Sequence, residues 1–199
     1  MRIGIFGGTF DPIHVGHLIL AEQCREQCQL DEVWFVPAAR PPHKLEATIS
    51  DAKQRTEMLE FAISGNPRFR VSKIELERSG PSFTYLTLEQ LKAEDASREL
   101  FLLIGADSVR DLPTWRNPEQ IIELATVVAV NRGEQPPPDI SHLGELTKSV
   151  AKPQLLTVTM PAIDISATEI RQRVREGRSI RYQVPRAVEV HIHEQRLYC

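Results

Sequence analysis

Several features are scarce in this chain of 199 residues, and each absence excludes a class of protein. The sequence has only three cysteines, Cys24, Cys28 and Cys199, which cannot all pair with one another. A disulfide framework is therefore excluded, and we expect the thiols to stay reduced. No apolar run approaches the roughly 18–20 residues of a membrane helix. The first residues lack the apolar region of a signal peptide, so we expect a cytoplasmic protein that does not enter a membrane.

An excess of positive charge is also absent. Lys and Arg number 24 and Asp and Glu number 27, which gives a net charge of -3. Nucleic acid is not an expected partner of such a chain, although a local basic pocket for a small anion is compatible with it. Hydrophobic residues make up 41% of the chain, enough for a sizeable core. The length fits a single domain over residues 1–199, and the sequence leaves a homo-oligomer open.

Apolar runs alternate with helical patterns along the chain. We expect strands at residues 2–6, 32–36, 69–76, 99–104, 126–130 and 155–158. We expect helices at residues 15–28, 51–64, 83–93, 117–124, 166–176 and 185–194. This alternation predicts an α/β fold, a Rossmann-like doubly wound and mostly parallel sheet flanked by helices. Two proline-containing segments, 38–50 and 132–149, are expected to form long surface loops.

The segment between the first strand and the first helix carries the first chemical signal. It reads GGTFDPIHVGH over residues 7–17. Glycines let the backbone approach an anion closely, and a helix N-terminus offers unpaired N–H groups. His14 and His17 are three residues apart, so we expect them to share one face in the first helical turn. Two imidazoles beside free amides would suit a polyphosphate.

Other interpretations of this segment stay open from the residues alone. Gly7 and Gly8 could form a plain turn beside incidental histidines. A metal site could combine the histidines with Cys24 or Cys28, but these cysteines lie two or three turns further along the helix, and we assign no metal ligand. The segment lacks both the G-x-G-x-x-G spacing and the Gly-Lys-Ser/Thr ending. Neither a dinucleotide dehydrogenase nor a P-loop ATPase is therefore indicated.

A second group of polar residues stands at the expected start of a helix near the C-terminus. Residues 165–171 read ISATEIR. Ser166 and Glu169 fit a capping box, which is a purely structural role. Thr168 and Arg171 are three residues apart and would share one helix face. A hydroxyl and a guanidinium at a helix N-terminus also suit phosphate oxygens.

The two segments together resemble the signatures of the nucleotidyltransferase superfamily with the HxGH motif. Along nearly its whole length the chain is similar to bacterial nicotinate-nucleotide adenylyltransferases, a resemblance carried also by PPHK at 41–44, GADS at 105–108 and VNR at 130–132. It implies that ATP and nicotinate mononucleotide are joined to give deamido-NAD and pyrophosphate, in NAD biosynthesis. It also implies Mg²⁺ that is carried mainly by ATP.

The resemblance implies a set of site residues. The expected catalytic residues are His14, His17 and Arg171, which would form a cationic cradle. The expected ATP contacts are Gly7, Gly8, Thr9, Phe10, Gly105, Asp107, Ile165, Ser166, Thr168 and Arg171. The expected contacts to the acceptor are His43, Lys44, Thr84, Trp115 and Arg132.

Structural interpretations of several of these residues stay open. Asp107 could cap a helix, and Trp115 could simply pack in the core. The chain also departs from the family pattern, with Phe83 in place of a tyrosine, Leu86 in place of an aspartate and Ala167 in place of a hydroxyl residue. Alternative functions are a transferase for another acceptor, nicotinamide mononucleotide or phosphopantetheine, and a non-catalytic nucleotide sensor.

Overall fold

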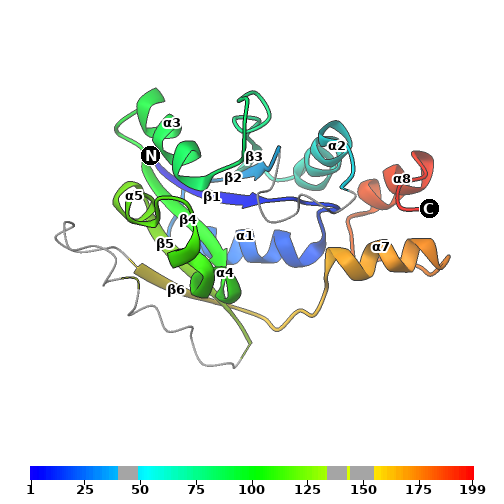
Figure 1. The fold of residues 1–199 in the computed structure, drawn as a ribbon. Helices are drawn as coiled ribbons and strands as arrows, with labels where there is room; N and C mark the ends of the chain where they lie inside the picture. The colour runs from blue at the N-terminus through cyan, green and yellow to red at the C-terminus, as the bar shows by residue number, and fades with distance from the viewer. Residues whose placement is uncertain (40–48, 134–142, 144–154) are drawn as a thin grey trace.

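The fold is built on one parallel sheet. The computed structural model describes residues 1–39, 49–133, 143 and 155–199. Its strands lie in the order β3-β2-β1-β4-β5-β6, and every pair is parallel (Figure 1). They are β1 (Arg2–Gly8), β2 (Glu32–Pro37), β3 (Phe69–Val71), β4 (Glu99–Gly105), β5 (Thr126–Arg132) and β6 (Leu155–Met160). The predicted doubly wound α/β fold is confirmed.

Helices cover both faces of the sheet. They are α1 (Val15–Gln27), α2 (Ala52–Ile63), α3 (Thr84–Glu94), α4 (Ala106–Asp111), α5 (Pro118–Leu124), α7 (Ala167–Arg175) and α8 (Arg186–Glu194), with a 3₁₀ turn η1 (Leu112–Thr114). Within the described ranges, none of the helices is long and apolar enough to cross a membrane.

The buried side chains form two layers, because successive residues of a strand point to opposite faces. Phe6 and Phe35 belong to one layer, which also contains side chains from α1, α2, α7 and α8. Ile5 and Trp34 belong to the other layer, with side chains from α3, α4 and α5. Strands that are covered on both sides must be apolar on both sides, which explains the nearly continuous apolar runs in the sequence.

Most expected elements are observed to within two residues, but two local predictions were wrong. The strand expected at 69–76 ends at Val71, because the apolar positions Val71 and Ile74 are three residues apart and break the two-residue period. The chain turns there, and the Leu76 N–H donates to the Lys73 carbonyl. The helix α4 was not predicted, since a helix of six residues is too short for a periodic signal. The loops expected at 38–50 and 132–149 lie largely outside the described residues.

The order of the strands creates a crevice at one edge of the sheet. From β1 the chain moves outward to β2 and β3, then crosses back so that β4 pairs with the other side of β1. The connections after β1 and β4 therefore lie on opposite faces and separate beyond the ends of these strands. Such a switch point is where open α/β sheets bind their ligands.

The packing of β1 predicts the effect of one substitution. A Cβ atom at Gly4 would lie 2.8 Å from Leu30 Cδ1 and 3.1 Å from Leu103 Cδ1. Because both leucines are buried, we expect Gly4→Ala to lower the free energy of unfolding by about 1–3 kcal/mol. Urea denaturation would measure the change. The control is Gly65→Ala, where a Cβ would meet nothing within 4 Å; equal stability of both variants would contradict the predicted overpacking.

Candidate active site

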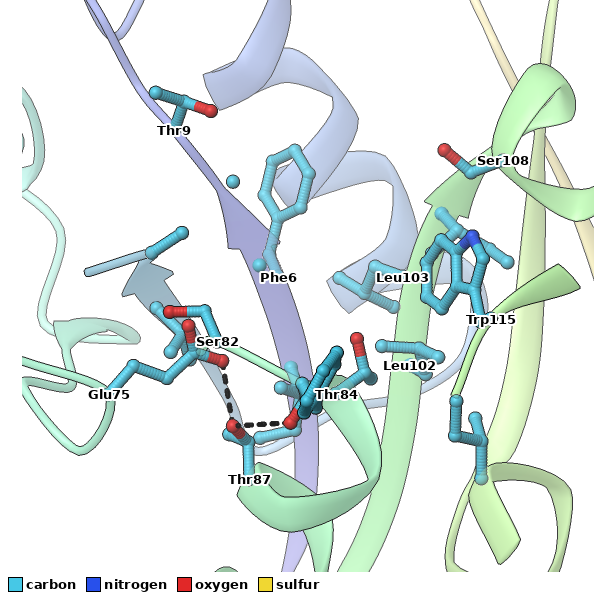
Figure 2. Close-up of a pocket in the computed structure, with 18 of the residues that line it drawn as sticks. Phe6, Thr9, Glu75, Ser82, Thr84, Thr87, Leu102, Leu103, Ser108 and Trp115 are labelled. Carbon is cyan, nitrogen blue, oxygen red and sulfur yellow. Dashed lines mark hydrogen bonds between the residues drawn. The ribbon is translucent and has the colours of Figure 1, made fainter. Parts of the chain in front are cut away.

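A cleft of about 710 Å³ opens at the carboxyl ends of β1 and β4, a size typical of small-molecule sites. Its walls come from residues 6–9 at the end of β1, residues 102–105 of β4 and residues 82–84 where α3 begins. In Figure 2, Trp115 and Ser108 lie on one side of the cleft, and Glu75, Ser82 and Thr87 lie on the other. The switch point between β1 and β4 thus holds a cavity.

Two glycines leave the backbone of the cleft open to a ligand. A Cβ atom at Gly7 or at Gly105 would meet nothing within 4 Å. Gly105 is the last residue of β4 and Gly7 the last but one of the neighbouring β1, and both line the cleft. A side chain at either position would fill space that a ligand could occupy. Glycine at these two positions therefore keeps the cleft open and is not required by packing in the core.

Gly8 is required by the close packing of the Phe10 ring against the backbone. A Cβ at Gly8 would lie 2.9 Å from the Phe10 ring. That ring is only 3% exposed and packs at 5.4 Å from the Phe6 ring and 5.2 Å from His17. Phe10 has a positive φ of 49°, which costs a residue with a side chain about 1–2 kcal/mol. Only its backbone is therefore available to a ligand.

His14 and His17 form a stacked pair at the start of α1. Their ring centroids are 3.6 Å apart with an interplanar angle of 22°. His14 is the N-cap residue of α1, with extended backbone, and not a member of the first turn as expected. Its N–H donates to His17 Nδ1 over 3.3 Å. Because that nitrogen accepts, the proton of a neutral His17 lies on Nε2.

Gly16, between the two histidines, is required by their packing. A Cβ atom there would lie 3.1 Å from His14 Nδ1 and 3.2 Å from His14 Cε1. The same atom would lie 3.7 Å from Cγ2 of Ile163, which precedes α7. The glycine of the HxGH pattern therefore lets the His14 ring lie flat against the helix start, next to the C-terminal segment.

The charge state of His14 differs from the expected cationic cradle. Its side chain is only 6% exposed. Burial, together with the positive charge of Arg132, lowers the pKa of His14 to about 4. At neutral pH His14 is therefore uncharged, and the positive charge of the site must come from elsewhere.

Arg171 brings the C-terminal segment to the same place. It lies on α7, which Figure 1 shows beside the carboxyl end of β1. Its Nη1 donates to the carbonyl oxygen of Asp11 over 2.7 Å, and its Nη2 donates to Thr168 Oγ1 over 3.3 Å. Asp11 is three residues before His14. The two signature segments therefore meet at Asp11, and we refer to His14, His17 and Arg171 together as the histidine–arginine cluster.

The start of α7 is built as the sequence indicates. Ser166 is the N-cap, and its Oγ accepts a hydrogen bond from the Glu169 N–H over 3.1 Å. Thr168 is exposed in the first turn, and Ile165 packs against the core layer. The cap function of Ser166 is confirmed, whereas contacts of these residues with ATP stay a prediction.

The start of α3 presents a second helix N-terminus to the cleft. Thr84 is the first residue of α3 and lines the cleft. The N-cap Phe83 makes no side-chain cap hydrogen bond. Amides at this end are therefore not capped by their own N-cap side chain, and the positive end of the helix dipole favours an anion.

Comparisons with known proteins agree with this architecture. A family model described as cytidylyltransferase-like matches residues 5–173. A protein of Thermus thermophilus named "Probable nicotinate-nucleotide adenylyltransferase" is 48% identical over 198 residues, and the similarity covers 100% of both chains. A protein of Bacillus pumilus with the same name is 42% identical, with 99% of this chain and 98% of the relative covered.

The chain belongs to the nicotinate-nucleotide adenylyltransferase family. Among solved structures, that of a Plasmodium falciparum nicotinic acid mononucleotide adenylyltransferase complexed with NaAD superposes with a TM-score of 0.79. It is 19% identical and covers 99% of this chain and 97% of that chain. At this identity the similarity is one of fold alone.

Several residues expected from the adenylyltransferase pattern lie outside the cleft lining. Asp107 follows β4 as expected, but its side chain is 91% exposed and forms an ion pair with Arg110. Arg132, expected to bind the acceptor, ends β5 and acts electrostatically on His14. His14, His17 and Arg171 are not among the residues that line the cleft. His43 and Lys44 lie outside the described residues.

Several polar residues of the cleft were not expected as site residues, among them Glu75, Thr87 and Arg116; Ser82 and Ser108 also line it, and Ser108 belongs to the GADS segment that carries the resemblance. The Thr87 hydroxyl donates to Glu75 Oε1 over 2.7 Å (Figure 2). Ser82 Oγ accepts from the Ala39 N–H over 2.9 Å. Arg116 follows Trp115, so its position next to an expected contact was the only available signal.

Among the described residues, no three His, Cys, Asp or Glu side chains are grouped as a metal site requires. Cys24 and Cys28 are buried free thiols.

The environment of His14 predicts a pH dependence of stability. Its pKa of about 4 in the folded state lies below the usual value near 6.5. The unfolded state therefore binds more protons, and stability that is present above pH 6.5 is lost as the pH falls toward 4. Between pH 7 and pH 5 the expected loss is about 2 kcal/mol.

Urea denaturation of the wild type and of His14→Gln at both pH values measures this loss. The His14→Gln variant should lack that part of the decrease, and His193→Gln, which changes an exposed histidine, should retain it. An identical pH dependence of the wild type and His14→Gln would contradict burial of a neutral His14.

Proposed function

We propose that the chain joins ATP and nicotinate mononucleotide to give deamido-NAD and pyrophosphate, a step of NAD biosynthesis. The observation that carries this proposal is the convergence of two distant segments on one strand end, where Arg171 is bonded to the carbonyl of Asp11. Membership in the adenylyltransferase family supports the choice of acceptor. We also propose that the enzyme works in the cytoplasm, and a homo-oligomeric state and a single-domain organisation stay predictions.

The reaction needs little covalent chemistry from the protein. A phosphate oxygen of the acceptor attacks the α-phosphorus of ATP and forms a new P–O bond. The bond from the α-phosphorus to the bridging oxygen breaks, and its electron pair leaves with pyrophosphate. Because the attacking monoester is already an anion at neutral pH, no general base is required. Alignment and charge stabilisation then supply the rate enhancement.

The histidine–arginine cluster is positioned for that stabilisation. His17 Nδ1 is occupied by the His14 N–H, so Nε2–H is the donor that it can offer to a phosphate oxygen. Arg171 supplies a permanent positive charge. The N–H groups of residues 8–10 supply further donors, as in other phosphate loops. Mg²⁺ would be carried by ATP, whose phosphate oxygens suit this ion, so it needs no dedicated protein ligands.

The cleft offers a complementary site for the pyridine part of the acceptor. The Trp115 indole lies along its wall (Figure 2), where an aromatic ring can stack. The uncapped start of α3, with Thr84, would receive the carboxylate, because a helix N-terminus favours an anion. Arg116, exposed at the same cleft, adds positive charge. Phosphate contacts from Arg132, His43 and Lys44 stay predictions.

A pyrophosphate-release assay tests the proposed function directly. The purified chain is incubated with ATP and Mg²⁺ together with nicotinate mononucleotide, nicotinamide mononucleotide or phosphopantetheine, or with no acceptor. We expect the highest kcat/KM with nicotinate mononucleotide. ATP binding without pyrophosphate release with any acceptor would instead identify a nucleotide sensor.

The role of His17 predicts a large loss of rate. Removing one donor to developing charge lowers kcat by about 10²–10³-fold, and we expect a loss of this size for His17→Ala. Steady-state kinetics and thermal melting would be measured together. His193→Ala removes an exposed histidine on α8 and serves as the control. A folded His17→Ala enzyme with a nearly normal kcat would exclude the assigned role.

The position of Trp115 predicts a selective effect on the acceptor. Stacking on a base-like ring contributes about 1–3 kcal/mol, so Trp115→Ala should raise the KM for nicotinate mononucleotide by about tenfold or more. The KM for ATP should change much less, and Trp115→Phe should retain most of the acceptor affinity. Equal losses of affinity for both substrates would argue against stacking on this ring.

A further inference from the structure

The buried carboxylate of Asp11 joins segments that are far apart in the sequence. Asp11 is only 4% exposed. Its Oδ1 accepts from the Tyr198 hydroxyl over 2.7 Å, and its Oδ2 accepts from the Ser50 N–H over 3.2 Å. Its carbonyl oxygen accepts from Arg171. One residue of the N-terminal loop therefore holds the C-terminal tail, the segment before α2, and α7.

Arg55, a buried residue of α2, also holds this loop through hydrogen bonds to its backbone. Its side chain is 2% exposed, Nη1 donates to the Thr9 carbonyl over 2.8 Å, and Nε donates to the Ser50 carbonyl over 3.0 Å. Its charge interacts with the Asp11 carboxylate. The backbone on both sides of Asp11 is thus restrained by hydrogen bonds. We therefore expect a displacement of the Asp11 carboxylate to displace residues 9–14 as well.

The last residues of the chain are held where Tyr198 can reach Asp11. The Leu197 N–H donates to the Ile192 carbonyl over 2.9 Å, and Leu197 and Tyr198 pack against the core layer. Burial and the adjacent Asp11 carboxylate both raise the pKa of Tyr198. Its hydroxyl therefore remains a protonated donor throughout the range in which the enzyme is assayed.

We propose that Tyr198 is a positioning residue for the adenylyl transfer. Through Asp11 it holds residues 8–10 and the guanidinium of Arg171 in a fixed relative position. Tyr198 does not touch the reacting atoms. Its hydroxyl keeps the Asp11 carboxylate in one orientation, and the Asp11 backbone then presents one carbonyl to Arg171 and carries the His14 segment. This proposal rests on the proposed function.

The test is Tyr198→Phe, which keeps the ring and removes only the hydroxyl, so that Asp11 Oδ1 loses its donor. We expect kcat/KM for ATP to fall at least fivefold, while KM for nicotinate mononucleotide changes less than twofold. The matched control is Tyr182→Phe, since Tyr182 is 84% exposed, and it should leave both parameters unchanged. Deletion of Cys199 alone should also have no effect.

A second measurement separates positioning from a general loss of stability. Kinetics are compared well below the melting temperature, in the wild type and in an Arg171→Lys background. If Tyr198 acts through Arg171, Tyr198→Phe should cost less than twofold in that background, because the oriented guanidinium is already gone. Losses that multiply in the double variant, a single-variant loss below twofold, or equal losses for both substrates would each overturn the proposal.

These outcomes are distinguishable from failure of the proposed function. A wild-type chain that releases no pyrophosphate with nicotinate mononucleotide would refute the function before any variant is made. A wild type that makes deamido-NAD, with a Tyr198→Phe variant of equal kcat/KM for ATP, would refute the positioning role alone.

Discussion

The hydrogen bond from Arg171 to the Asp11 carbonyl is the contact on which the rest of the site depends. It joins residues 160 positions apart at a distance of 2.7 Å. Because Asp11 lies in the sequence between the glycine-rich turn and the stacked histidines, this bond ties α7 to the loop that joins β1 and α1. A charge-assisted bond is stronger and more directional than a neutral one. The two signatures therefore become one site only when α7 is packed on the sheet.

The positive character of this site does not come from both histidines. His14 is buried and neutral, with its pKa lowered to about 4, and its ring is held flat by Gly16 and His17. Arg171, Arg132, backbone amides and helix N-termini remain as the sources of positive potential. A hydrogen-bond donor that is fixed in one orientation needs no reorganisation at the moment of reaction. The site thus combines the charges of two arginines with the dipoles of backbone amides and helix N-termini.

The sheet could be predicted from the sequence because strands that are buried on both faces require continuous apolar runs, as residues 99–104 and 126–130 show. The end of β3 could not, because Ile74 and Glu75 are buried by a turn that uses apolar residues outside the sheet. His14, His17 and Arg171 were expected to be catalytic because their segments resemble the two superfamily signatures, and that role stays a prediction. The contact of Tyr198 with Asp11 has no local pattern, because no spacing relates residues 187 positions apart.

A crystal structure of the chain with a non-hydrolysable ATP analogue tests the central claim most directly. The account predicts α-phosphate oxygens at about 3 Å from His17 Nε2 and from a nitrogen of Arg171, with the triphosphate over the amides of residues 8–10. A triphosphate that binds elsewhere in the cleft, with no hydrogen bond to either side chain, would contradict it.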